Sequence, residues 1–234
     1  MQFTSFSLVA LSFALPSLVS AHGYVASVSV NGKTYHGGTP GHPSGPVRNV
    51  NTVSPVTSTG DGNLACGPGA GPVSGSAQAS PGSTVQFHWV GGGGVPWPHE
   101  VGPVMTYMAS CNGPCSKFNA AGAQWFKIGQ SGKSGSSWPE HAGIKNGQPS
   151  SAKIPSGLAS GEYLIRNEII GLQNAMRKGG AEFFPSCTQL KVSGNGNGKP
   201  SNTVKFPGGY SAGEKGLLYD VRLSLFVLGL GLRR

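Results

Sequence analysis

The sequence is poor in acidic residues, and this scarcity limits the chemistry it can carry. Asp and Glu number 8 against 17 Lys and Arg in 234 residues, so the formal net charge is +9. A glycoside hydrolase needs two carboxylates about 5–9.5 Å apart, and no acidic residue here lies in a matching motif. The positive residues are scattered rather than interleaved with aromatic side chains, which permits weak binding to polyanions but does not indicate a nucleic-acid-binding protein. Hydrolysis and nucleic-acid binding are both disfavoured.

Long apolar runs are also missing. Residues 6–19 are mostly apolar, but a membrane-spanning helix needs about 20 such residues. The run ends in Val19-Ser20-Ala21, the small-residue pattern of a secretory cleavage site, although residues 1–21 contain no Lys or Arg. We interpret residues 1–21 as a signal peptide, which makes the protein secreted and extracellular, with His22 as its first mature residue. In an unprocessed protein, where this segment would be a buried first strand, His22 would be an ordinary histidine.

The C-terminal residues 222–234 contain a second short apolar run. The mostly apolar stretch 223–232 is too short to cross a membrane. It could be a last strand, a disordered tail or the product of a mis-called exon, and we favour the last. We therefore expect a single domain over residues 22–221 and no membrane association.

Glycine and proline are abundant, at 39 and 18 residues, while charged residues make up 11% of the chain. Short segments of alternating apolar and polar residues, such as 24–30 and 84–90, are separated by Gly, Pro, Asn and Ser. Strands of this kind, divided by turn residues, indicate an antiparallel sandwich or barrel. We predict an all-β protein with long loops.

The four cysteines suggest two disulfides in a secreted chain. Cys111 and Cys115 enclose the turn sequence Asn-Gly-Pro, so a local bridge is plausible, and this leaves Cys66 to pair with Cys187. A zinc site made of all four cysteines is the alternative, and an oxidising compartment disfavours it. The sequence has no Asn-x-Ser/Thr sequon, so we expect no N-glycan.

His22 is the candidate metal ligand of greatest interest. An N-terminal histidine offers two nitrogens, its imidazole and its α-amine, once the amine loses a proton from a pKa near ~8. The best partner is His99, which lies between a Gly/Pro-rich loop and a strong strand signal. Three nitrogens in a plane suit Cu(II), which favours tetragonal sites, better than they suit zinc, which prefers a tetrahedron. His36, His42, His88 and His141 are interpreted as residues of loops or of the sheet surface.

Ordered blocks across the chain carry a resemblance to one family. They are His22-Gly23-Tyr24, Pro96-Trp97-Pro98-His99, and the segments 107–115, 161–170 and 180–187. These blocks resemble the fungal lytic polysaccharide monooxygenases of auxiliary-activity family nine, formerly glycoside hydrolase family 61. The resemblance implies a monomeric, immunoglobulin-like antiparallel β-sandwich that holds one copper ion through His22 and His99.

The resemblance also implies the activity. Such enzymes cleave cellulose or a related β-glucan oxidatively, with an external electron donor and either dioxygen or hydrogen peroxide. The C–H bond next to the glycosidic link is hydroxylated, and the link then breaks by elimination. Tyr24 and Tyr210 are the aromatic residues expected to stack on sugar rings.

Three positions depart from the family pattern as we align it. Asn167 stands where the family has a histidine that donates a hydrogen bond to bound oxygen species, and Glu182 stands where it has Gln. Phe184 replaces the axial Tyr and cannot coordinate a metal. Glu182 adds negative charge near the metal and could itself be a ligand. We predict a retuned oxidative enzyme. The alternative is a non-catalytic copper- or glucan-binding protein.

Overall fold

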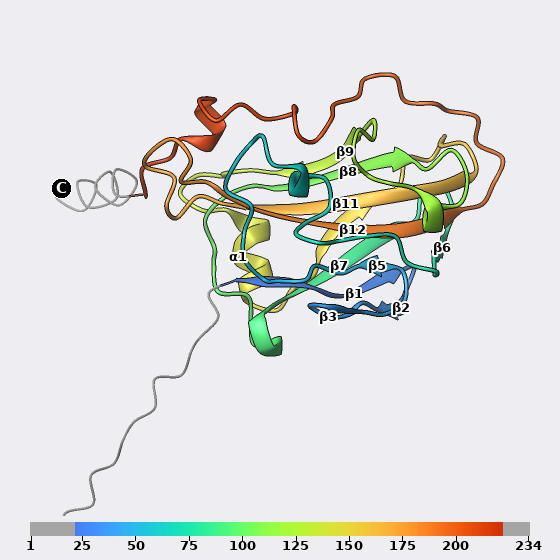
Figure 1. Cartoon of the computed structure of the whole chain (residues 1–234), viewed down its shortest axis with the longest axis horizontal. Coiled ribbons are helices and arrows are strands. Elements are labelled where there is room, and N and C mark those ends of the chain that lie inside the picture. The colour runs from blue at the N-terminus through green and yellow to red at the C-terminus, as the bar shows by residue number, and fades with distance from the viewer. Residues whose placement is uncertain (1–21, 222–234) are drawn as a thin grey trace, which may run out of the picture.

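The computed structural model describes residues 22–221, which form two packed β-sheets joined by long loops (Figure 1). The predicted all-β, immunoglobulin-like antiparallel sandwich is confirmed. The proposed signal peptide, residues 1–21, and the C-terminal tail, residues 222–234, lie outside the described part. Within residues 22–221, no helix is long and apolar enough to cross a membrane.

The smaller sheet has four antiparallel strands in the order β10-β7-β1-β2. The strands are β1 (Gly23–Val30), β2 (Lys33–His36), β7 (Thr84–Gly91) and β10 (Ser150–Lys153). In β7 every second residue is buried. This is the period expected of a strand with one face on the core.

The larger sheet has six strands, in the order β5-β12-β11-β8-β9, with β6 paired in parallel to β12. They are β5 (Val47–Arg48), β6 (Ala77–Ala79), β8 (Val104–Ser110), β9 (Phe126–Ser131), β11 (Gly161–Gly171) and β12 (Glu182–Val192). The two longest strands, β11 and β12, pair along their whole length. The loop that joins them, residues 172–181, therefore emerges at one end of the sandwich.

Short elements complete the fold. The two-residue strands β3 (Gly38–Thr39) and β4 (His42–Pro43) form a separate pair. The helix α1 spans Pro139–Lys145, with proline in its first turn, where the missing N–H costs no intrahelical bond. The 3₁₀ turns are η1 (Gly62–Leu64), η2 (Gly92–Gly94), η3 (Cys115–Lys117) and η4 (Lys215–Leu217).

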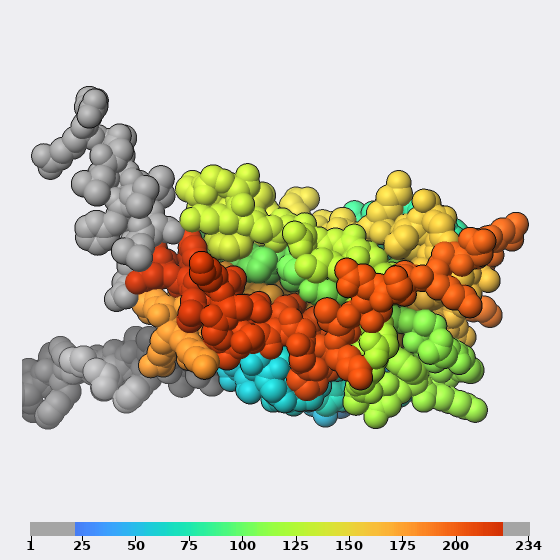
Figure 2. Space-filling model, turned by 90° about the horizontal axis from the view of Figure 1, so that it is seen from above, coloured from blue at the N-terminus to red at the C-terminus, as the bar shows by residue number. Residues whose placement is uncertain are grey.

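Two apolar clusters stabilise the sandwich, one on each face of the larger sheet. The first fills the space between the sheets and includes Phe87, Trp97 and Phe184. The second lies on the outer face and includes Phe183 and Phe206. The C-terminal part of the described chain runs across this outer face, as the orange-to-red segment in Figure 2 shows. Since Phe183 and Phe184 are consecutive in β12, their side chains point to opposite faces.

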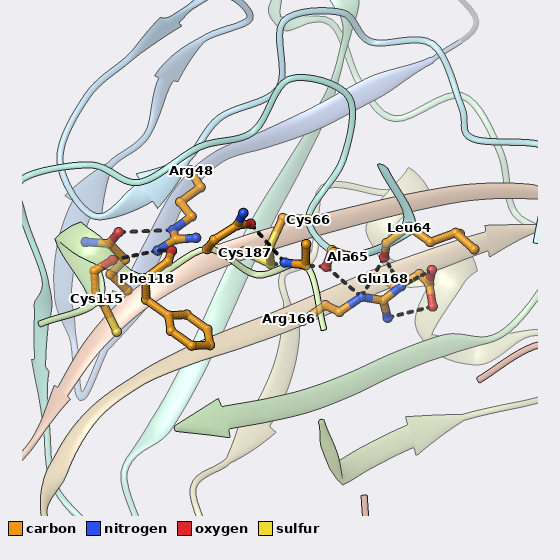
Figure 3. Close-up of a disulfide and its surroundings, with 12 residues drawn as sticks. Arg48, Leu64, Ala65, Cys66, Cys115, Phe118, Arg166, Glu168 and Cys187 are labelled. Carbon is orange, nitrogen blue, oxygen red and sulfur yellow. Dashed lines mark hydrogen bonds and ion pairs between the residues drawn. A yellow bond between two sulfur atoms is a disulfide. The ribbon is translucent and has the colours of Figure 1, made fainter. Parts of the chain in front are cut away.

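The two disulfides have the predicted pairing. Cys66 joins Cys187 across 121 residues (Figure 3). Cys111 joins Cys115. All four cysteines are therefore used, and the alternative of a zinc site made from them is wrong. In the chain-entropy model, the long-range bridge stabilises the fold by about 4–5 kcal/mol.

Candidate metal centre

His22 and His99, the two predicted metal ligands, lie side by side. His22 immediately precedes β1. The strand β1 begins at the end of the sandwich where α1 lies (Figure 1). The His22 carbonyl accepts a hydrogen bond of 2.7 Å from the Gly92 N–H. A Cβ at Gly23 would lie 1.9 Å from the Val90 carbonyl oxygen, so only glycine lets β1 approach β7 this closely. The His22 and His99 ring centroids are 6.1 Å apart.

Glu182, the first residue of β12, completes a cluster with the two histidines. Potential ligand atoms of His22, His99 and Glu182 all lie within 4.8 Å of one another. The Glu182 Oε2 is 3.9 Å from His22 Nε2, and the Glu182 side chain is only 12% exposed. Two imidazoles and a carboxylate are ligands that divalent transition metals accept. The donor set therefore fits a metal ion such as copper, and an α-amine on His22 would add a further nitrogen.

Two aromatic side chains, Phe184 and Trp97, pack against the two imidazoles and form an aromatic wall beside them. Phe184 stacks on the His22 ring, with centroids 5.8 Å apart and planes 29° apart, and lies 6.2 Å from the His99 ring. Trp97 meets His99 and Phe184 edge-on, at 5.7 and 5.1 Å. Phe184 offers no ligand atom, so it closes one side of the cluster without coordinating. The axial place expected for Phe184 and its role in catalysis stay predictions.

His141 holds this wall in place, although the sequence indicated an ordinary loop histidine. It lies in α1, is 1% exposed, and accepts a hydrogen bond of 2.9 Å from Trp97 Nε1 at its own Nε2. The ring proton is therefore on Nδ1, which donates to the Gly102 carbonyl at 3.1 Å. Both hydrogen bonds fix the loop that carries His99. The predicted loop position of His141 is wrong, because the residue lies in the short helix α1, which turns it inward.

The burial of His141 predicts that stability falls in mild acid. Burial lowers the pKa of His141 from 6.5 to about 4. Stability from the neutral ring is therefore complete above pH 6.5 and is lost as pH falls toward about 4. The expected loss is about 3 kcal/mol. Urea unfolding measured from pH 7 to pH 4 should show it, and a His141→Phe variant should lack that part of the pH dependence. An equal pH dependence in both proteins would contradict the account.

Asn167 does not face the cluster, and its predicted role is wrong. The residue is fully buried in the middle of β11. Its amide oxygen accepts from Trp89 Nε1 at 2.8 Å, and its amide nitrogen donates to Thr106 Oγ1 and Ser150 Oγ, both at 3.0 Å. Both amide hydrogens are thus engaged inside the sandwich, and none remains for a ligand at His22.

Sequence reasoning also missed Gln173, which lies just beyond the end of β11. Its Nε2 donates to Glu182 Oε2 at 2.5 Å, and the neighbouring Asn174 Nδ2 donates to Glu182 Oε1 at 2.8 Å. The Gln173 Oε1 is buried and has no hydrogen-bond partner among residues 22–221. The position of Gln173 in the sequence could have indicated this role, because binding residues lie more often in loops at strand ends than inside paired strands.

Neither tyrosine predicted to contact sugar presents a free ring at the cluster. Tyr24 is 6% exposed within β1. Tyr210 stacks on Phe183 at 5.3 Å, which places it across the sheet from Phe184 and His22. Its hydroxyl donates to Glu168 Oε2 at 2.5 Å, and burial raises its pKa well above 10.0. The prediction for Tyr24 is wrong because its ring is buried in β1. Tyr210 keeps part of its ring exposed, and its contact with sugar stays a prediction.

A half-exposed aromatic pair lies near this end of the molecule instead. Trp138, which precedes α1, meets Tyr219 edge-on with centroids 5.6 Å apart. The Tyr219 N–H donates to the Ala175 carbonyl at 2.9 Å, which ties the pair to the loop that carries Gln173.

Comparisons with known proteins place these features in a family. The model of Auxiliary Activity family 9, formerly GH61, matches residues 22–225. The chain is 47% identical over 220 residues to lytic polysaccharide monooxygenase D of Gloeophyllum trabeum, covering 92% of this chain but only 63% of that longer protein. It is 34% identical to lytic polysaccharide monooxygenase B of Heterobasidion irregulare, covering 92% of this chain and 90% of that protein.

A solved structure agrees with these matches. The crystal structure of a cellulose-active polysaccharide monooxygenase from M. thermophila superimposes with a TM-score of 0.76 at 31% identity. The superposition covers 86% of this chain and 91% of that one.

Proposed function

Because the chain belongs to Auxiliary Activity family 9, we propose that it is a copper-dependent monooxygenase that cleaves cellulose or a related β-glucan oxidatively. The observation that carries the proposal is the meeting of His22, His99 and Glu182 in one cluster. We assign the activity to a single domain over residues 22–221 that acts as a monomer. The choice of cellulose draws on the cellulose-active relative from M. thermophila.

His22 and His99 would hold the copper ion. In the mature protein His22 would bind through its α-amine and its imidazole, and His99 would bind through its imidazole. Such a set of nitrogens suits the tetragonal preference of Cu(II). A bound copper ion would supply one-electron redox chemistry, with an external electron donor as the reductant and dioxygen or peroxide as the oxidant of the C–H bond next to the glycosidic link.

The surrounding side chains would position and shield the ligands. Phe184 lies against both imidazoles, so it excludes water and a protein ligand from that side. Trp97 and His141 fix the loop of His99 through their hydrogen bond of 2.9 Å. The half-exposed rings of Trp138 and Tyr219 are the aromatic surface we propose for contact with the glucan.

Two other classes of function are less well supported. A non-catalytic binding protein was suggested partly by Asn167, but Asn167 is a satisfied core residue and so is no sign of a decayed site. A hydrolase needs two carboxylates at the site, whereas the cluster contains one, Glu182. We further propose secretion to the extracellular space, in agreement with the two disulfides, which persist in oxidising compartments.

Product chemistry tests the proposed function. Mature protein loaded with one equivalent of copper is incubated with amorphous cellulose, ascorbate and peroxide, and the products are identified by mass spectrometry. We expect oxidised oligosaccharides from this protein and none above background from a His99→Ala variant, which also controls for free copper. Plain reducing ends would indicate a hydrolase. The absence of any product from cellulose and from other β-glucans would contradict the proposal.

A further inference from the structure

The Glu182 carboxylate is held rigidly beside His22 without a basic partner. Its Oε2 accepts from Gln173 and its Oε1 accepts from Asn174. Among residues 22–221 the structure gives it no Lys or Arg within 4.0 Å, and its closest basic group is His22 Nε2 at 3.9 Å. A carboxylate largely removed from water is costly unless a cation or further hydrogen bonds offset its charge.

Gly171 and Gln173, which come before Glu182 in the chain, lie against each other. The Gln173 side chain folds back over Gly171, so a Cβ added there would lie 2.7 Å from Gln173 Oε1 and 3.1 Å from Nε2. Gly171 does not have a positive φ, so its backbone would accept another residue. A Cβ at position 171 would therefore push the Gln173 amide away from its present place beside Glu182. The arrangement places the Glu182 carboxylate beside His22 and His99 and leaves Gln173 Oε1 without a partner in the described part of the chain.

We propose that Glu182 supplies a carboxylate oxygen to the metal held by His22 and His99. The proposal rests on the metal site of the proposed function and adds a charged oxygen ligand to its nitrogens. Potential ligand atoms of the three residues lie within 4.8 Å of one another. Ligand atoms about 2.0–2.2 Å from one ion are roughly 3–4 Å apart, so small side-chain shifts close the set. An anionic ligand favours Cu(II) over Cu(I), since attraction grows with the charge of the ion.

The test compares copper binding in variants of the mature protein. Glu182→Gln removes the charge but nearly preserves the shape of the side chain. Glu100→Gln is the matched control, because Glu100 follows His99 in the chain but pairs with Lys145 at 2.9 Å on the surface. Cu(II) dissociation constants are measured by competition with a chelator, and the Cu(II) environment is recorded by electron paramagnetic resonance. The reduction potential is measured on the same samples.

We expect Glu182→Gln to weaken Cu(II) binding at least tenfold, to change the resonance spectrum and to raise the reduction potential. Changes around a metal commonly cost about 10–100-fold in affinity even where no ligand is lost. Glu100→Gln should leave all three measurements unchanged. Gly171→Ala, which displaces Gln173 but keeps the carboxylate, should weaken binding less than Glu182→Gln does. It also provides an independent result should Glu182→Gln fold poorly by circular dichroism.

The outcomes separate this proposal from the metal site itself. If His99→Ala loses tight binding while Glu182→Gln keeps the affinity and spectrum of the unmodified protein, the metal site stands and Glu182 is not a ligand. If Gly171→Ala and Glu182→Gln both bind normally, the role of the Gln173 contact is also overturned. If His99→Ala binds copper as well as the unmodified protein, both the proposed site and the role of Glu182 are wrong.

Discussion

A protein that keeps Ala21 in front of His22 is expected to lose oxidative cleavage and to bind Cu(II) at least tenfold more weakly than the mature protein. The extra residue converts the α-amine of His22 into an amide, whose nitrogen is a poor ligand. The side chains of His22, His99 and Glu182 remain in place in this protein. Those of His22 and Glu182 are positioned by β1 and β12. Losing a nitrogen ligand should cost at least as much as the changes around metal ligands, about 10–100-fold.

The matched control for this experiment carries the extra alanine at the other end of the chain. Both proteins are titrated with Cu(II) against a competing chelator and assayed for oxidised products. Equal affinity and equal product yield in the two proteins would show that the α-amine takes no part in binding.

Glu168→Gln is expected to lower the free energy of unfolding by about 3–5 kcal/mol, because it leaves a buried charge without its partner. The carboxylate of Glu168 binds Arg166 through two hydrogen bonds of 2.9 and 2.6 Å, and both side chains are fully buried (Figure 3). The guanidinium also donates to the carbonyls of Leu64 and Ala65 and lies 3.9 Å over the Phe206 ring. Because neither side chain is exposed to solvent, bulk water does not offset the Arg166 charge once Glu168 is neutral.

Urea unfolding with intact disulfides measures this effect. Glu100→Gln removes the partner of Lys145, but those side chains are 55% and 40% exposed, so it should cost less than about 1 kcal/mol. A similar loss of unfolding free energy in the two variants would mean that the buried Arg166–Glu168 pair stabilises the fold no more than the surface pair does.

The sequence predicted the architecture well because strand alternation and cysteine spacing are local signals. The alternating residues of β7 became a half-buried strand, and the turn between Cys111 and Cys115 became a local disulfide. Local signals could not predict that His22 lies next to His99, because this depends on a tertiary contact, the pairing of β1 with β7 at Gly23. The resemblance to a family supplied that contact, and composition alone could not.

The wrong predictions concern residues whose role depends on which face of a strand they occupy or on where the strand ends. Asn167 was chosen by its place in a motif, but the pairing of β11 with β8 and β12 buries it between the sheets. Gln173 lies only six residues further on, and it reaches Glu182 because β11 ends at Gly171. His141 was missed because a helix of seven residues leaves a weak periodic signal.

The most direct test of a metal centre at His22 and His99 is anomalous diffraction. Crystals of the mature protein, soaked with one equivalent of Cu(II), are measured on both sides of the copper absorption edge. The account predicts one anomalous peak about 2 Å from the His22 amine, the His22 imidazole and the His99 imidazole. A peak elsewhere, or no peak between the two histidines, would contradict it.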